Sequence, residues 1–257
     1  MKSWVIVWRF LARMSLITDA QAKQFDELGY FVTEPMFDAK TLAEASAEFE
    51  RLHEDWIEEC RRKGDATAVE LALYRPFIGG AHGRSEVLAR FVKQAIYVEA
   101  CARFVGPGAD LYFNQVVIKP PEVGQSFAWH QDSGYVITVP QAYITCWTAV
   151  SRTFVDNGCI WIIPGSHKLG LVEHVRDQEL NALVAQFADD SGAIPVEMEA
   201  GQVAVFSSLM LHRSGANTSD EVRLGYVPQY HVPGVVRADT GELMGDQHPV
   251  LRGGQPV

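Results

Sequence analysis

Long apolar runs and clusters of basic side chains are both missing from this chain of 257 residues. No segment approaches the roughly 18 consecutive apolar residues that a membrane-spanning helix needs, which argues against a transmembrane protein. Lys and Arg number 22 against 32 Asp and Glu, for a formal net charge of -10. An acidic chain without basic runs has little attraction for phosphate groups, which argues against nucleic acid or anionic membranes as its main partner.

Paired cysteines are missing as well. The four cysteines form no C-x-x-C pair and follow no regular spacing: Cys60, Cys101, Cys146 and Cys159. Such a set does not make a disulfide scaffold in a chain of this length, so the reducing cytoplasm is the expected location. The rest of the composition, 47% hydrophobic and 21% charged, is that of a globular protein, expected as a monomer or weak oligomer.

The first thirteen residues, MKSWVIVWRFLAR, are apolar, but Arg9 interrupts them and no small-residue cleavage site follows. We therefore predict that residues 1–13 are a disordered extension or reflect an upstream start, rather than a signal peptide. Residues 14–257 are predicted to form a single domain, because Met14 opens a stretch typical of an ordinary N-terminus.

Helix signals dominate residues 18–106. Thr18-x-x-Gln21 is a capping box that predicts a helix through Leu28, ended by Gly29 and followed by a short strand at residues 30–32. Asp38 and Ser85 are the predicted N-caps of two further helices.

From residue 107 to 232 the sequence changes to short β-rich runs separated by turn residues. The expected strands are Leu111–Ile118, Ala142–Val150, Cys159–Ile163, Val203–Phe206 and Arg223–Tyr230. Helices followed by many short strands predict a mainly β protein, either a β-barrel or a jelly roll, buttressed by N-terminal helices. Two further expectations are a helical insertion at Gln178–Phe187 and a strand-like segment at Leu71–Arg75.

The segment His130-Gln131-Asp132 is a candidate metal site. In extended backbone, residues two apart point to the same face, so this imidazole and carboxylate can grip one ion. Alone, H-x-D does not distinguish a ligand pair from a polar loop, and His53-Glu54-Asp55 repeats the pattern. That copy lies on a predicted amphipathic helix, where residues two apart do not face each other, so we interpret it as solvated surface.

A second imidazole would complete a two-histidine, one-carboxylate face, which leaves open positions on iron and suits oxygen activation. The remaining histidines are His82, His167, His174, His212, His231 and His248; His174 and His248 look like surface residues. His212 follows an apolar run that would place it at a barrel mouth, with Ser214 on its face and Arg223 opening the next strand. An arginine and a hydroxyl can bind the far carboxylate of a dicarboxylate cosubstrate; the alternative is a core-edge histidine and a surface arginine.

Together these features resemble the phytanoyl-CoA dioxygenase (PhyH-like) family, from about Phe25 to Tyr230. The resemblance is carried by Trp129-His130-Gln131-Asp132, Asn157-Gly158-Cys159, Pro164-Gly165-Ser166-His167, Gly201-Gln202-Val203, and His212-x-Ser214 with Arg223. It implies a double-stranded β-helix that uses Fe(II), 2-oxoglutarate and O2. By position, it implies His130, Asp132 and His212 as iron ligands, and Arg223, Ser214, Trp147 and Gln115 as 2-oxoglutarate contacts.

The resemblance implies oxidation of a C–H bond of a small organic molecule, with release of succinate and CO2. Halogenases of the wider class have a small residue in place of the carboxylate, so Asp132 predicts hydroxylation or another oxidation instead. The alternatives are a cupin-like hydrolase or isomerase using another metal, and a non-catalytic binding protein on the same fold.

Aromatic residues near the proposed site are candidate substrate contacts, although a barrel core would look the same in sequence. They are Phe127, Trp129, Tyr135, Tyr143 and Trp161. Arg75 can meet an anionic group of the substrate, with surface placement as the alternative.

Overall fold

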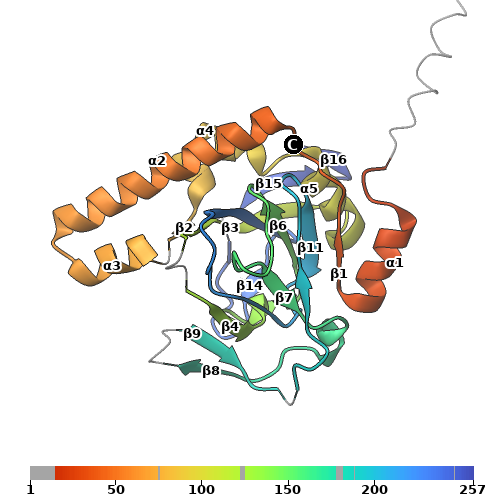
Figure 1. Ribbon diagram of the computed structural model, residues 1–257. Coiled ribbons are helices and arrows are strands. Elements are labelled where there is room, and N and C mark those ends of the chain that lie inside the picture. Colours follow the sequence, from red (N-terminus) through yellow and green to blue (C-terminus); the bar gives the residue numbers. More distant parts are fainter. Residues whose placement is uncertain (1–14, 75, 122–124, 178–181, 188, 246) are drawn as a thin grey trace, which may run out of the picture.

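The computed structural model describes residues 15–74, 76–121, 125–177, 182–187, 189–245 and 247–257 (Figure 1). The predicted N-terminal extension, residues 1–13, lies outside this part of the chain. The helices, all in the N-terminal half, are α1 (Asp19–Leu28), α2 (Ala39–Lys63), α3 (Ala66–Tyr74), α4 (Glu86–Phe91) and α5 (Ala95–Ala100). Shorter helical turns are η2 (Ala81–Arg84), η3 (Cys101–Val105), η4 (Asp132–Gly134) and η5 (Ser166–Leu169).

The predicted helix caps are confirmed. The Thr18 hydroxyl accepts from the Gln21 backbone N–H at 3.2 Å, and the Gln21 side chain accepts from the Thr18 N–H at 2.9 Å. Gly29 ends α1 in the left-handed conformation, with φ 81°. Asp38 and Ser85 accept from backbone N–H groups at the starts of α2 and α4.

The strands form two antiparallel sheets. The larger has the order β1 (Tyr30–Val32), β11 (Val203–Ser207), β6 (Ile144–Ala149), β13 (Arg223–His231), β3 (Ala109–Lys119), β15 (His248–Arg252) and β16 (Gln255–Pro256), with β2 (Phe77–Gly79) also paired to β3. The smaller has the order β10 (Ile194–Val196), β7 (Ile160–Ile162), β12 (His212–Ser214) and β4 (Phe127–His130). Two further two-stranded pairs complete the description: β5 (Thr138–Val139) with β14 (Val236–Arg237), and β8 (His174–Asp177) with β9 (Ala182–Ala185).

The helices cover one face of the larger sheet, and the smaller sheet lies toward the other. On the helical side, Phe49 of α2 and Phe91 of α4 pack against Tyr226 of β13, with ring centroids 6.0 and 5.5 Å apart. Tyr97 of α5 bonds through its hydroxyl to Thr148 of β6 at 2.5 Å. Every residue of β6 is buried, because both faces of this central strand are covered. The predicted jelly roll with helical buttresses is confirmed.

Two local predictions were wrong. The segment predicted as a helix at Gln178–Phe187 contains strand β9, which pairs with β8 in antiparallel register. The strand-like segment at Leu71–Arg75 lies in α3 as far as Tyr74, and Arg75 falls outside the described residues. Alanine, leucine and glutamate make α3 a good helix former, and the chain turns back so that its Ala72 carbonyl bonds His53 of α2.

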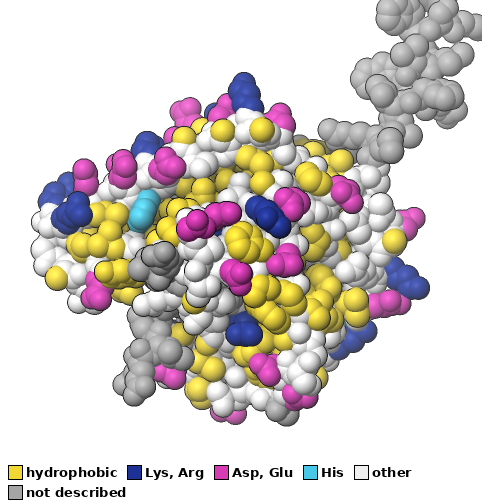
Figure 2. Space-filling model, viewed as in Figure 1, with side chains coloured by type: hydrophobic (Ala, Val, Ile, Leu, Met, Phe, Trp, Pro, Cys, Tyr) yellow, Lys and Arg dark blue, Asp and Glu magenta, His cyan; other side chains and the backbone are white. Residues whose placement is uncertain are grey.

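The surface carries both signs of charge. On the face in Figure 2, Lys and Arg side chains are scattered among Asp and Glu rather than gathered in one patch. All four cysteines are buried and none forms a disulfide. Among the described residues, no helix combines the length and apolar character needed to cross a bilayer.

Candidate metal centre and cosubstrate cavity

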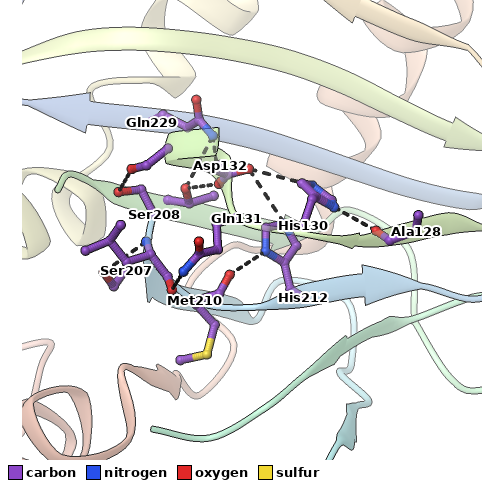
Figure 3. A network of polar contacts seen from close by, with 12 residues as sticks. Ala128, His130, Gln131, Asp132, Ser207, Ser208, Met210, His212 and Gln229 are labelled. Atoms are coloured by element: carbon purple, nitrogen blue, oxygen red, sulfur yellow. Dashed lines mark hydrogen bonds and ion pairs between the residues drawn. The ribbon is translucent and has the colours of Figure 1, made fainter. Parts of the chain in front are cut away.

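His130 and His212 face each other on neighbouring strands of the smaller sheet. Their Cα atoms are register partners between β4 and β12, and their ring centroids are 4.2 Å apart. Asp132 follows at the start of η4, with Oδ1 3.9 Å from His130 Nε2 and 3.6 Å from His212 Nε2. One ligand atom from each residue lies within 4.8 Å of the other two (Figure 3). The structure therefore brings together the three side chains that the sequence singled out.

Backbone carbonyls fix the orientation of both imidazoles. His130 Nδ1 lies 2.8 Å from the Ala128 carbonyl, and His212 Nδ1 lies 3.0 Å from the Met210 carbonyl. A carbonyl can only accept, so each Nδ1 donates its N–H to the backbone, and Nε2, which lies on the side of Asp132, is the atom left to bind a metal. Two neutral imidazoles and a carboxylate are the donor set that a divalent iron site requires.

The second oxygen of Asp132 is held by two hydrogen bonds from the larger sheet. Thr145 of β6 donates its hydroxyl to Oδ2 at 2.6 Å, and Gln229 of β13 donates Nε2 to the same atom at 2.9 Å. Gln229 also donates to the Thr145 hydroxyl at 3.3 Å. This arrangement leaves Oδ1 toward the histidines (Figure 3) and fixes the orientation of the carboxylate.

Sequence analysis missed this role for Thr145 and Gln229. The sequence signal that could have revealed it is a polar residue on the cavity-facing side of a strand that is otherwise apolar. Thr145 faces the cavity, whereas its neighbours Ile144 and Cys146 face the other side of the sheet and pack in the core beneath the helices. A polar side chain on such a face needs a partner when buried, and that partner is Asp132.

Gln131, between the two ligands, points away from them and ties neighbouring loops together. Its fully buried side chain donates to the Gly170 and Leu209 carbonyls and accepts from the Val172 N–H. Its own N–H donates to His174 Nε2 at 3.1 Å. The expectation that His174 is a surface residue was wrong, because this histidine is half-buried behind the metal centre.

A cavity of about 670 Å³ opens beside these residues, between the two sheets. Its lining includes His130, Asp132 and His212, together with the four residues predicted to contact 2-oxoglutarate: Arg223, Ser214, Trp147 and Gln115. Alternate residues face the cavity on two strands: Tyr143, Thr145 and Trp147 at and along β6, and Phe113, Gln115 and Val117 along β3.

Arg223 is the buried cation of the cavity, with a relative exposure of 1%. Its Nη1 donates to the Gly158 carbonyl at 2.7 Å, and its guanidinium lies over Trp147, 5.1 Å from the ring centroid. Burial lowers the pKa of Arg223 to about 10. Its buried Nε has no hydrogen-bond partner, and among the described residues no carboxylate forms an ion pair with it. A buried, incompletely bonded guanidinium of this kind fits an anionic ligand.

Gly225 allows the close approach of Trp147 to this part of β13. A Cβ built on Gly225 would lie 2.5 Å from the Trp147 ring. Any larger residue would displace the indole that covers the guanidinium of Arg223.

Of the aromatic residues predicted near the substrate, Phe127, Tyr135 and Tyr143 line the cavity. Trp129 does not: it lies against Arg213, whose guanidinium is 5.3 Å from its ring centroid, and donates to Asp190 at 3.0 Å. A β-bulge explains the difference, because β4 places His130 opposite His212 but Phe127 opposite Ser214. Trp161 packs on the other side of Arg213, and Arg75 lies outside the described residues.

Comparison with known proteins agrees with this geometry. The family model described as phytanoyl-CoA dioxygenase (PhyH) matches residues 25–225. The chain belongs to this family. An Arabidopsis thaliana phytanoyl-CoA dioxygenase is 32% identical over 113 residues, which cover 43% of this chain and 40% of that protein. The peroxisomal phytanoyl-CoA dioxygenase of Mus musculus is 26% identical over 228 residues, 81% of this chain and 67% of that protein. The match thus spans about two fifths of the plant relative.

Solved structures similar to this PhyH-family chain include non-haem oxygenases. The apo form of the non-haem monooxygenase ThoJ is 26% identical with a TM-score of 0.67, covering 84% of this chain and 79% of that one. EctD from S. alaskensis, solved with 2-oxoglutarate and 5-hydroxyectoine, is 21% identical with a TM-score of 0.67, covering 86% and 78%. At that identity the EctD likeness shows the shared jelly-roll fold.

Proposed function

We propose that this protein is an Fe(II)- and 2-oxoglutarate-dependent dioxygenase that oxidises a C–H bond of a small organic molecule, with O2 as cosubstrate and succinate and CO2 as products. The observation that carries the proposal is the pairing of two features in one cavity. One is the cluster of two histidines and one carboxylate, and the other is the buried Arg223, whose Nε has no hydrogen-bond partner. The first feature fits iron and the second fits the far carboxylate of 2-oxoglutarate.

The residues present suit an iron ion. His130 Nε2, His212 Nε2 and Asp132 Oδ1 would hold it, and Thr145 and Gln229 would keep the carboxylate in place. Bound iron together with 2-oxoglutarate supplies the oxidising chemistry, so no side chain need act as a nucleophile or general base. The protein's part is to bind, to orient and to exclude water.

Arg223 would bind the far carboxylate of 2-oxoglutarate with its guanidinium, and Ser214 would add a hydroxyl donor. Both are nearly buried, so the ion pair would form in a medium of low polarity, where charge-assisted bonds are strong. Trp147 would form the wall beside the cosubstrate, and Gln115 would reach it from β3.

We assign oxidation rather than halogenation because Asp132 occupies the third ligand position. Thr145 and Gln229 support this assignment, since both donate to its carboxylate. A halogenase would need that position open for a halide ion.

Uncoupled turnover tests the proposal without a known substrate. The full chain, supplied with Fe(II), 2-oxoglutarate and O2, should release succinate slowly, and omission of Fe(II) should stop it. A cupin-like hydrolase or a non-catalytic binding protein would form no succinate under these conditions. Absence of succinate together with no binding of 2-oxoglutarate to the Fe(II)-loaded protein would contradict the proposal.

A further inference from the structure

The cavity continues past the metal centre into a chamber with three phenol rings. We call this region the tyrosine chamber and define it by Tyr112, Tyr135, Tyr143, Val136 and Met244, all of which line the cavity. The rings of Tyr112 and Tyr143 are 4.7 Å apart, and Tyr135 lies edge-on to His130 at 5.5 Å. A molecule in the chamber would therefore lie next to the metal ligands.

The far wall of the tyrosine chamber comes from the C-terminal part of the chain. Strand β14 pairs with β5, and the Met244 N–H donates to the Val235 carbonyl at 2.9 Å. Gly245, with φ 80°, lies directly on Tyr112, because a Cβ there would come within 2.9 Å of the ring. These contacts place Met244 opposite the phenol rings.

The described residues of the tyrosine chamber carry no ionisable group except the phenols. Burial raises the pKa of Tyr112 and Tyr143, so both hydroxyls stay protonated and can donate or accept hydrogen bonds. Among the described residues, the arginines that line the cavity are Arg213 and Arg223. Arg213 is stacked between Trp129 and Trp161, neither of which lines the cavity.

The chain segments that carry Tyr135 and Met244 expose further apolar side chains. Ile137, Val139 and Leu243 are exposed by 51%, 56% and 65%, and Tyr135 by 50%. The nearby Arg237 is already paired with Asp239, its Nη2 lying 2.9 Å from a carboxylate oxygen. Large apolar side chains exposed together mark a binding surface for an apolar molecule.

We infer that the substrate is a neutral, mainly apolar, ring-bearing small molecule with a hydroxyl or carbonyl group for the phenols, and that it is neither an acyl-CoA thioester nor a carboxylate. The inference rests on the proposed function and names its substrate class. Among the described residues, the chamber offers an anion no unpaired cation, because Arg237, whose charge acts on Tyr112, is already paired with Asp239. Aromatic rings, in contrast, would stack on the phenols. The phosphates of a CoA ester would likewise meet the exposed apolar side chains of these segments.

A matched pair of probes tests the charge preference. The full chain, loaded with Mn(II) and saturating 2-oxoglutarate so that Arg223 is engaged, is titrated with 2-naphthol and with 2-naphthoate. The two share one ring system, but only the second is an anion at neutral pH. We expect 2-naphthol to bind at least about tenfold more tightly, which corresponds to about 1.4 kcal/mol.

A charge placed in the chamber should reverse the preference. Met244→Arg should tighten 2-naphthoate binding relative to 2-naphthol by about tenfold or more, because the guanidinium supplies the missing partner. Leu169→Arg, at a residue 64% exposed on η5 and not lining the cavity, is the matched control and should leave both affinities unchanged.

The outcomes separate this inference from the proposed function. Equal or tighter binding of 2-naphthoate to the unaltered protein, or binding of neither probe, overturns the substrate class while 2-oxoglutarate binding stays intact. Loss of metal-dependent 2-oxoglutarate binding overturns the proposed function, whatever the probes do. If the Leu169→Arg control shifts as much as Met244→Arg, the probes bind elsewhere and the chamber assignment is wrong.

Discussion

The two ends of the cavity are held in different ways. At the cosubstrate end, Arg223 and Trp147 are 1% and 5% exposed and stand on the central strands β13 and β6. At the substrate end, Tyr135 is 50% exposed and Met244 belongs to the segment after β14. The groups assigned to the shared chemistry at this end are thus fixed by the sheet, whereas the groups assigned to substrate choice are divided: Tyr112 stands on β3, but Tyr135 and Met244 stand on connecting segments. Segments of that kind can change shape without disturbing the barrel.

The largest expected effect is at the metal centre, where both ends meet. Asp132→Ala should weaken iron binding sharply and abolish succinate formation, because it removes one of the three protein ligands and the only negatively charged one. Metal binding by isothermal titration and succinate release are the two measurements. The control is Asp55→Ala in the other H-x-D segment, where the exposed carboxylate pairs with Arg51 at 2.8 Å. Full activity in Asp132→Ala, or its loss in Asp55→Ala, contradicts the assignment.

The second-largest expected effect is at the cosubstrate end of the cavity. Arg223→Ala should raise the 2-oxoglutarate concentration for half-maximal turnover about ten- to hundredfold, since a charge-assisted bond contributes about 1.5–3 kcal/mol. Arg213→Ala removes a guanidinium that is stacked between two tryptophans and should leave that concentration nearly unchanged. If the two variants exchange these results, the carboxylate is bound by Arg213.

Much of the buried end could be predicted because the family resemblance fixes residues by their position in the motif. It placed Trp147 of β6 and Arg223 of β13 beside the cosubstrate, and both line the cavity, as regular alternation along these strands allows. On β4 the bulge broke the alternation, so Phe127 faces the cavity and Trp129 does not. A bulge depends on the partner strand, which the local sequence does not specify.

Dependence on a partner strand also explains why the helix predicted at Gln178–Phe187 was wrong. The spacing of Leu180, Leu183, Val184 and Phe187 fits a helical stripe as well as any other pattern. In the structure, Leu183 and Val184 belong to a strand because β8 offers an edge for pairing. The tyrosine chamber was also only partly foreseen, since Met244 reaches it from a segment far along the chain from Tyr112.

A smaller effect should come from the bonds that orient Asp132. Thr145→Val keeps the shape of the side chain but removes the donor at 2.6 Å from Oδ2. We expect iron affinity to fall by about tenfold, the low end of such effects, because Gln229 still donates to the same oxygen. The matched control is Thr153→Val, since Thr153 is equally buried but its hydroxyl has no hydrogen-bond partner.

The paired variant Thr145→Val with Gln229→Leu should lower iron affinity further than either change alone. A merely structural role predicts lower thermal stability with unchanged iron affinity. That result, or an equal loss in Thr153→Val, would show that the two donors do not orient the carboxylate.

The smallest effect concerns pH and the histidine packed behind the metal centre. Burial lowers the pKa of His174, whose Nε2 accepts from the Gln131 N–H and whose Nδ1 donates to the Val172 carbonyl. The unfolded chain therefore takes up this proton first, near the ordinary histidine value of about 6.5, so the contribution to stability is intact above that pH and lost as the pH falls below it. Urea unfolding at about pH 7.5 and about pH 5.5 should show lower stability in acid. His174→Gln should reduce that difference, leaving the part due to His167 and His231, whose pKa values are also lowered by burial. An undiminished difference in the variant would assign the acid sensitivity to those two histidines, and the Gln131 contact would then contribute nothing to it.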